Sequence, residues 1–339
     1  MNSTPIAPPL PVRALAVYLC LLAGGGSLWY VLSQPVGSKS EAPRLVLIRP
    51  QTGALTIARA LKDAGVIRSR FAFLAVAVAR GTHRHLLAGE YEFAPGLPLL
   101  EIVPRLEQGQ GLVHAVTIPE GFAAQQIAQV LADSGLIDWD RFMRLLRDHQ
   151  TLEAHRLGGG SLEGYLFPDT YRLVKGMSEE AIIHRMVRRF QEVFGPEEQA
   201  RAKELDMSVP EVVTMASLIE REARVSQERA LISAVFHNRL RRGMPLQSDP
   251  TVLYGLSRFG GRLTKANLQA PSPYNTYLHQ GLPPGPIANP GRASILAALY
   301  PASSRYLYFV SKNDGTHAFS NTLQEHDALV RRYQIGRGG

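Results

Sequence analysis

The chain has 339 residues, and its 37 lysines and arginines against 29 acidic residues give a formal net charge of +8. Hydrophobic residues make up 45% of the chain, which excludes an intrinsically disordered protein and allows a sizeable core. The single cysteine, Cys20, excludes an intrachain disulfide and a cysteine-ligated zinc or iron–sulfur site. The basic excess suits an anionic partner, although an ordinary basic surface explains it equally well.

Only one stretch is long and apolar enough to cross a bilayer, which excludes a polytopic membrane protein. Residues 14–33 carry no charge, and Trp29 lies near the far end, where aromatic rings favour the membrane interface. The alternative is a cleaved signal peptide with small residues at Gly24–Ser27, but the apolar run continues past them. The predicted segments are a cytoplasmic tail over residues 1–13, a transmembrane helix over 14–33 and a polar linker over 34–43.

After the linker the chain repeats itself at an offset of about seventy residues. Val46–Ile48 and Val116–Ile118 open the two copies, and each is followed by apolar residues at i and i+4 and then by a glycine. This order predicts a strand, an amphipathic helix and a helix stop in each copy. Gly89–Phe93, between the copies, alternates like a strand.

A strand–helix–helix–strand unit with this opening resembles a LysM module, a small fold that binds N-acetylglucosamine polymers. The resemblance predicts a LysM-like region over residues 44–155. The alternative is a repeated packing unit that binds nothing. The second copy keeps a Pro-Glu-Gly turn at Pro119–Gly121, whereas the first departs from it by an insertion at Arg49–Gly53.

The composition changes after the glycines at 158–160, and we predict a mixed α+β catalytic domain over residues 156–335. Leu162–Tyr171 combines aromatic rings with the carboxyl groups of Glu163 and Asp169. Aromatic faces stack on sugars and carboxylates bind hydroxyl groups, so this segment is a candidate sugar site. An edge strand followed by a turn explains the same pattern.

A helix predicted over Pro210–Arg224 carries the candidate catalytic residue, Glu220. Its apolar positions form one stripe, and Glu220 lies at the edge of that stripe. Desolvation at a core edge raises the pKa of a carboxyl group, which is what a general acid at neutral pH requires. The alternative is an exposed ion pair of Glu220 with Arg224 at i,i+4, worth about 0.3–0.5 kcal/mol.

Proline-containing loops follow this helix over residues 243–251, 273–277 and 281–291. Their polar side chains are hydrogen-bonding types rather than Ser and Gly filler, which favours binding over a flexible linker. A strand over Tyr306–Val310 and a returning strand over Gly315–Ser320 predict a hairpin that turns at Asn313–Gly315. The candidate substrate-binding residues of the domain are Glu163, Asp169, Gln247, Ser248, Asp249, Thr251, Tyr254, Tyr274, Asn275, Thr276 and Tyr277.

Several blocks, in matching order and spacing, resemble the YceG-like (MltG) family of endolytic murein transglycosylases. The resemblance implies cleavage of the β-1,4 bond from N-acetylmuramic acid to N-acetylglucosamine inside peptidoglycan strands, with a 1,6-anhydro end on the product. It maps the family's catalytic glutamate onto Glu220. The blocks are Ala216–Glu222, Leu246–Thr251, Tyr274–Tyr277 and Gly281–Ile287, with further matches at Leu162–Tyr171, Tyr306–Val310 and His317–His326.

The resemblance also implies where the protein works and with what. We expect a single-pass protein of the cytoplasmic (inner) membrane, with its catalytic body on the periplasmic or extracytoplasmic side. Its partners would be peptidoglycan glycan strands and the peptidoglycan synthases (penicillin-binding proteins) whose nascent strands it would end. No cofactor is implied, and neither metal nor nucleic acid is expected. The ten histidines show no HExxH spacing, and the basic residues are scattered.

One carboxyl group suffices for the implied reaction. Protonated Glu220 would give its proton to the leaving oxygen and then, as a carboxylate, take one from the C6 hydroxyl of the muramic acid. Glu222 and Asp249 are weaker candidates that could assist it. One rival interpretation is a hydrolase in which Asp249 supports a water or a covalent intermediate. The other is a membrane-tethered scaffold that binds peptidoglycan without cleaving it.

Overall fold

The computed structural model describes residues 26, 29–30, 33–37, 40–155, 157, 160–261 and 263–335. The predicted cytoplasmic tail lies outside these residues, and so does most of the predicted transmembrane helix. Across the described ranges, no helix is both long enough and apolar enough to span a bilayer. Two compact units are present: one extends to His114 and includes Val174–Met177, and the other comprises Ala115–Leu173 and the chain from Ser178 onward.

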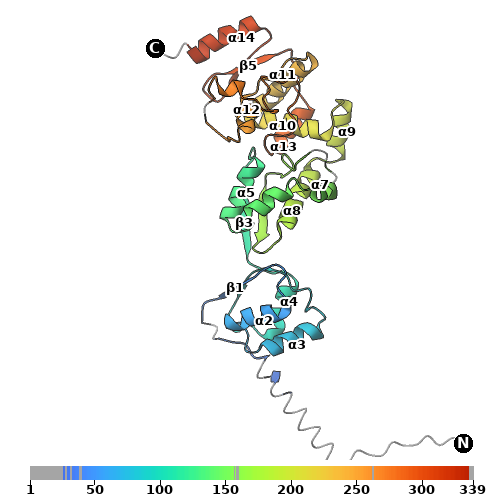
Figure 1. The fold of residues 1–339 in the computed structure, drawn as a ribbon, viewed down its shortest axis with the longest axis vertical. Helices are drawn as coiled ribbons and strands as arrows, with labels where there is room; N and C mark the ends of the chain where they lie inside the picture. Colours follow the sequence, from blue (N-terminus) through green and yellow to red (C-terminus); the bar gives the residue numbers. More distant parts are fainter. Residues whose placement is uncertain are drawn as a thin grey trace, which may run out of the picture. The chain divides into compact units, whose positions relative to one another are not determined.

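The first unit contains the first copy of the repeat (Figure 1). β1 (Arg44–Ile48) pairs antiparallel with β2 (Gly89–Phe93), and α2 (Ala54–Asp63) and α3 (Arg70–Ala79) lie between them in the sequence. A further helix, α4 (Leu99–Glu107), follows and packs against α3. The predicted order of strand, helix, helix and strand is therefore confirmed.

The periodicity that predicts α2 also decides which of its faces is buried. Ile57 and Leu61 lie four residues apart, and both are fully buried in one core together with Phe73 of α3. The helix ends at the predicted stop, because Gly65 adopts a φ of 71°, a left-handed conformation that glycine reaches without a Cβ clash.

The second copy follows the same order with one additional helix before the closing strand. β3 (Val113–Thr117) pairs with the later strand β4 (Thr170–Val174), and α5 (Ala124–Asp133), α6 (Trp139–Leu145) and α7 (His149–His155) lie between them in the sequence. Ile127 and Leu131 of α5 are fully buried, as their counterparts are in α2.

The two copies do not share one compact unit, which differs from the predicted region over residues 44–155. Described residues from Ala115 onward pack with the C-terminal part of the chain instead. The physical reason is hydrogen bonding: Glu163 caps the first turn of α5 at Ala124, and Asn289 pairs with the backbone of Phe122. The second copy is thus part of the unit that carries Glu220.

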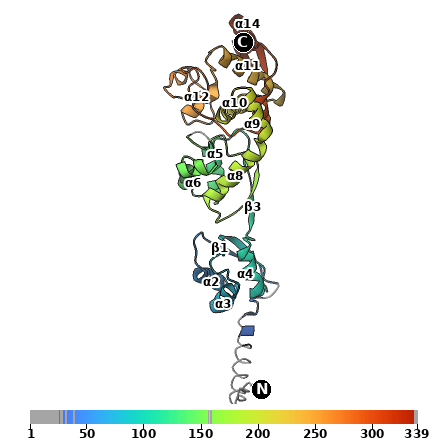
Figure 2. The same ribbon diagram turned by 90° about the vertical axis from the view of Figure 1, so that its right-hand side faces the viewer.

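The remaining helices build the body of the second unit (Figures 1 and 2). α10 is its central helix: every residue from Val212 to Ile219 is buried, and α13, α11 and α12 pack against it. The helices are α8 (Glu179–Val193), α9 (Pro196–Glu204), α10 (Val209–Glu222), α11 (Arg229–Arg241), α12 (Asp249–Gly255), α13 (Arg292–Leu299) and α14 (Leu323–Val330), with short turns at Ser226–Glu228, Asn267–Gln269 and Arg331–Ile335.

Local sequence signals set the ends of these elements. Ser208 and Glu211 form a reciprocal capping box at the start of α10, with Pro210 in its first turn. The helix agrees with the predicted one to within two residues at each end. The predicted hairpin is also confirmed, since β5 (Tyr308–Ser311) pairs antiparallel with β6 (His317–Ser320). The mixed α+β class is confirmed as well.

Candidate active site

Glu220 lies in the last turn of α10, and its side chain is only 7% exposed. Its Oε2 accepts a 3.0 Å hydrogen bond from the backbone N–H of Gly291, and Nη2 of Arg229 lies 3.5 Å from its Oε1. The ion pair is therefore formed with Arg229 of α11, whose side chain is 13% exposed. This differs from the alternative prediction, an exposed pair with Arg224.

A second carboxyl group, which the sequence analysis did not assign, lies beside Glu220. It belongs to Glu120, in the turn between β3 and α5, where the repeat places its Pro-Glu-Gly sequence. Burial of this carboxyl group raises the pKa of Glu120, the negative charge of Glu220 raises it further, and Arg229 lowers it. The repeated turn was visible in the sequence, but nothing there indicated that it would meet α10.

Glu222 points into a different environment, although it is only two residues away. It accepts a 2.6 Å hydrogen bond from the Ser248 hydroxyl, and burial raises the pKa of Glu222 to about 7. The charge of Asp249 raises that pKa further, while the Ser248 hydrogen bond lowers it. Asp249 itself accepts a 2.6 Å hydrogen bond from the Tyr277 hydroxyl.

These side chains line a polar cavity of about 480 Å³. Gln247 enters it from a backbone with a φ of 50°, a left-handed conformation that is uncommon for a residue with a side chain. The guanidinium of Arg239 donates to the carbonyls of Leu307 and Leu246 and to the Gln247 side chain. The predicted residues Gln247, Asp249 and Tyr277 are thus brought together around Glu222.

Three of the predicted binding residues support loops from within. The hydroxyls of Thr251 and Thr276 lie 2.9 Å apart, and Thr276 accepts a hydrogen bond from the backbone N–H of Ser248. The side-chain amide of Asn275 donates to two backbone carbonyls of its own loop. All three side chains are fully buried, so their observed contacts are structural.

Glu163 is the centre of a third cluster of hydrogen-bonded residues. Its carboxyl group accepts hydrogen bonds from the backbone N–H of Ala124 at 2.9 and 3.0 Å, from the Asn289 amide at 2.9 Å and from the Tyr254 hydroxyl at 3.2 Å. Burial raises the pKa of Glu163 to about 7, against the opposing effect of these donors.

A cavity of about 430 Å³ opens beside Glu163. The rings of Tyr254 and Tyr274 lie 4.9 Å apart in its wall, and Arg147 and Pro286 also line it. Two of the predicted substrate-binding residues are therefore adjacent. Asp169 joins none of these groups: it pairs with Arg189 of α8 at 2.7 Å.

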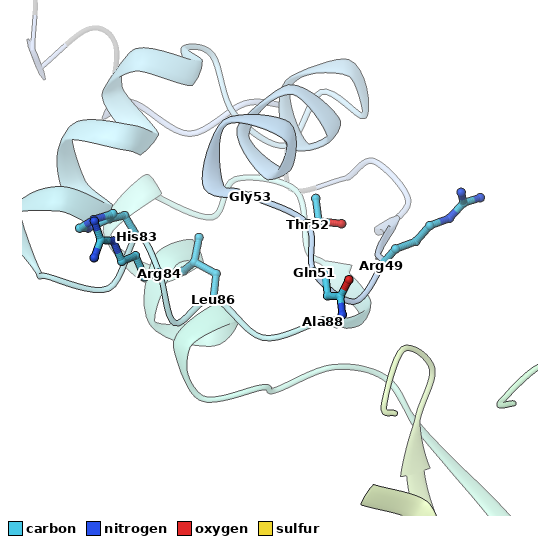
Figure 3. Close-up of a pocket in the computed structure, with 8 residues that line it drawn as sticks. All are labelled: Arg49, Gln51, Thr52, Gly53, His83, Arg84, Leu86 and Ala88. Atoms are coloured by element: carbon cyan, nitrogen blue, oxygen red, sulfur yellow. The ribbon is translucent and has the colours of Figure 1, made fainter. Parts of the chain in front are cut away.

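The first unit has a cavity of its own, also of about 430 Å³ (Figure 3). The turn from Arg49 to Gly53 forms one side, and His83, Arg84 and Leu86 form the other. It lies where the first copy departs from the Pro-Glu-Gly turn of the second copy. Its lining carries two arginines and no acidic side chain.

The recorded contacts of Glu220 in the described residues do not include Asp249. In the part of the chain that the structure describes, no group of three or more His, Cys, Asp or Glu residues is placed to hold a metal ion. Asp249 interacts with Tyr277 and Glu222, whereas the groups that contact Glu220 are Gly291 and Arg229.

Comparison with known proteins places the chain among a single group of relatives. The pattern of the YceG-like family matches residues 46–332. An endolytic murein transglycosylase of Bacillus subtilis is 36% identical over 92% of this chain and 91% of its own length. One of Streptococcus pneumoniae is 28% identical over 95% of this chain, which covers 65% of that longer protein. A crystal structure of a yceG-like protein from Listeria monocytogenes aligns with a TM-score of 0.60 and 34% identity, over 86% of this chain and 100% of the other.

Proposed function

The chain belongs to the YceG-like family, and from this premise we propose that it is an endolytic murein transglycosylase, a lyase that cuts peptidoglycan glycan strands. The observation that carries the proposal is the position of Glu220. A nearly buried carboxyl group stands at the end of the central helix, between a backbone N–H donor and a half-buried arginine. That setting fixes the direction in which the carboxyl group points, as proton transfer to a bound sugar requires.

The proposed reaction cuts the β-1,4 bond from N-acetylmuramic acid to N-acetylglucosamine. Protonated Glu220 donates its proton to the glycosidic oxygen, and the bond from that oxygen to C1 breaks. The C6 hydroxyl of the same muramoyl unit attacks C1 and gives its proton to a carboxylate, which closes the 1,6-anhydro ring. No water enters, and the nucleophile is already positioned because it belongs to the reacting sugar.

Two cavities of the second unit supply candidate glycan contacts. Gln247 and Tyr277 line one of them, and Tyr254 and Tyr274 line the other. Aromatic rings stack on sugar C–H faces, while amide and hydroxyl groups bond to the sugar hydroxyls. Ser248 would act through Glu222, to which its hydroxyl is bonded.

Digestion of purified sacculi by the full-length protein tests this function. The wild-type protein is expected to release fragments with anhydro ends, each one water lighter than the hydrolytic product, as read by mass spectrometry. Glu220→Gln should remove cleavage while circular dichroism and the unfolding temperature stay near those of wild type. Cleavage by a folded Glu220→Gln protein would contradict the assignment of Glu220.

The same digestion separates the rival interpretations. Products heavier by one water would support a hydrolase, and binding to sacculi without any released fragment would support a scaffold. The hydrolase interpretation gains nothing from the position of Asp249, which interacts with Tyr277 and Glu222.

We also propose that the uncharged stretch over residues 14–33 anchors the protein in the cytoplasmic membrane, with the catalytic unit outside the cytoplasm. Its work there would be to end nascent strands beside the peptidoglycan synthases. Membrane fractionation and protease accessibility from the periplasmic side test the anchor. Co-purification with a synthase tests the partnership.

For the first unit we propose a LysM-like role in holding glycan chains. The support is its strand–helix–helix–strand order and the cavity beside the turn from Arg49 to Gly53 (Figure 3). Thr52→Trp would fill that cavity and should weaken binding of the full-length protein to sacculi. Unchanged binding would favour a packing unit without a ligand.

A further inference from the structure

Glu120 and Glu220 meet at one glycine. The N–H of Gly291 donates to Glu220, and the carboxyl group of Glu120 occupies the place where a side chain of residue 291 would begin. The φ of Gly291 is −76°, which any residue can adopt, so a side chain at this position would displace the carboxyl end of Glu120 rather than strain the backbone. The missing side chain creates the room in which the second carboxyl group lies beside the first.

The turn that carries Glu120 is fixed to the same helix as Glu220. Gly121 has a φ of 78°, and its N–H donates a 2.9 Å hydrogen bond to the carbonyl of Asn289. Its carbonyl accepts a 3.2 Å hydrogen bond from Nη1 of Arg221, the residue that follows Glu220. The two hydrogen bonds of Gly121 therefore hold the adjacent Glu120 in position beside Glu220.

Folding alone does not explain why Glu120 lies there. Among the described residues, none forms a hydrogen bond or an ion pair with its carboxylate, and the residue is exposed. Burial of the inner side of the carboxyl group and the charge of Glu220 both raise the pKa of Glu120, and Arg229 only partly offsets them. A like charge held in place without a compensating bond is typical of a site shaped for function.

We propose that Glu120 is the second catalytic carboxylate of this site and accepts the proton of the muramoyl C6 hydroxyl. The proposal rests on the proposed function and divides its two proton transfers between two groups. Glu220 gives its proton to the glycosidic oxygen, the C1–O bond breaks, O6 bonds to C1, and the O6 proton passes to Glu120. The pair then holds the one proton with which it began, now on Glu120, and its return to Glu220 restores the site.

The geometry favours this division for two reasons. Glu220 is nearly buried between Gly291 and Arg229, whereas Glu120 stands at the solvent side, where a free hydroxyl of a bound sugar can reach it. Two carboxylates that repel each other also favour a state with a single proton between them. The reaction starts from the form of that state in which the proton lies on Glu220 and Glu120 is ionised.

Kinetics of the full-length protein on soluble glycan strands test the proposal. Glu120→Gln removes the charge at nearly constant shape, and we expect kcat to fall by roughly 10²–10⁴-fold with a similar KM. Glu120→Asp, which keeps the base but shortens it, should recover part of kcat. Glu197→Gln, at an exposed glutamate in the first turn of α9, is the matched control and should leave kcat unchanged.

The pH profile gives a second readout that a purely structural role would not move. Activity should rise with pH as Glu120 ionises, and this acidic limb should disappear in Glu120→Gln. A kcat within threefold of wild type in a folded Glu120→Gln protein would overturn the proposal. If Glu220→Gln is inactive at the same time, only the role of Glu120 fails; if Glu220→Gln is active, the proposed function of the site fails.

Titration by carboxyl ¹³C NMR checks the coupling without any turnover. Because the charge of Glu220 raises the pKa of Glu120, the Glu120 pKa should fall in Glu220→Gln. An unchanged titration of Glu120 in that variant would show that the two carboxyl groups do not interact, and would overturn the proposal as well.

Discussion

The side-chain amide of Asn289 donates a 2.9 Å hydrogen bond to Oε1 of Glu163, joining residues 126 positions apart in the chain. The same Asn289 also donates to the carbonyl of Phe122 and accepts from the backbone N–H of Leu166. Glu163 in turn caps the start of α5 at Ala124. One buried pair therefore holds together the turn before α5, the segment that contains Glu163 and the chain leading to Gly291.

Replacement of Asn289 should destabilise the protein more than the loss of one small side chain would suggest. Asn289→Ala leaves several buried donors and acceptors without partners, each costing about 1–3 kcal/mol, so we expect the free energy of unfolding to fall by at least about 3 kcal/mol. Denaturant unfolding of the full-length chain measures it. Asn321→Ala, at an exposed position just before α14, is the control, and an equal loss in the two variants would contradict the prediction.

The stability of the second unit should fall as the pH rises from about 4.5 to about 7. The pKa of Glu163 is raised by burial to about 7 from an ordinary value of 4.5, so the folded state binds the proton more tightly than the unfolded state. This contribution is fully present below the unfolded-state pKa and is lost as the pH passes the folded-state pKa. It amounts to on the order of 3 kcal/mol.

Comparing wild type with Glu163→Gln at pH 5 and pH 8 isolates that contribution. The glutamine cannot ionise, so its free energy of unfolding should depend less on pH than that of wild type. Glu153→Gln, at an exposed position of α7, should keep the wild-type dependence. Identical pH dependence in Glu163→Gln and wild type would show that Glu163 does not titrate in this range.

Gly164 is predicted to tolerate no side chain. Its φ is 88°, and an added Cβ would stand 2.5 Å from Pro286 and 2.7 Å from Val213. Backbone strain and overpacking together should cost Gly164→Ala about 2–5 kcal/mol of unfolding free energy. Gly243 has a similar φ of 63° but open space around it. Gly243→Ala should therefore lose only the unfolding free energy that backbone strain costs, about 1–2 kcal/mol. Equal losses in thermal or denaturant unfolding would count against the packing argument.

Removal of Arg229 should destabilise the protein through Glu220. Arg229→Met leaves a nearly buried carboxylate without its ion-pair partner, a change that costs about 3–5 kcal/mol in buried pairs. In the double variant Glu220→Gln/Arg229→Met no charge is left unpaired, so part of the loss should return. A strictly additive double-mutant cycle would show that the two side chains do not interact.

Ser248 should tune the titration of Glu222. Its hydroxyl donates to the carboxyl group and so favours the ionised form, which holds the pKa of Glu222 below the value that burial alone would give. Ser248→Ala should therefore raise the Glu222 pKa above about 7, as followed by carboxyl ¹³C NMR. A lower pKa in that variant would mean that the hydrogen bond does not act on the ionised carboxylate.

Local patterns in the sequence predicted the elements well. The apolar stripe of α10 and the Asn-Asp-Gly turn of the hairpin are signals carried within a few residues, and the structure confirms the corresponding helix and hairpin. The β-branched openings of the two repeat copies likewise predicted β1 and β3. The order of strand and helix that the two copies share followed from these signals.

Long-range contacts were beyond the reach of those patterns. Glu120 meets Glu220 because Gly121 pairs with Asn289, and no periodicity near residue 120 indicates that partner. Asp169 was predicted to contact substrate from its neighbourhood of aromatic residues, yet the structure pairs it with Arg189. In each case the outcome depends on which distant segment packs alongside, and the sequence of the turn itself does not specify that segment.

Two glutamates separated by one residue at the end of α10 face different surroundings. A helix turns by about 100° per residue, so positions 220 and 222 stand about 200° apart and sample independent environments. Substitutions that alter the loop around Ser248 can thus adjust one acid while leaving its neighbour untouched. An insertion of a single residue earlier in the helix would instead rotate both glutamates away from their present contacts at once. This segment should therefore accept substitutions far more readily than insertions or deletions.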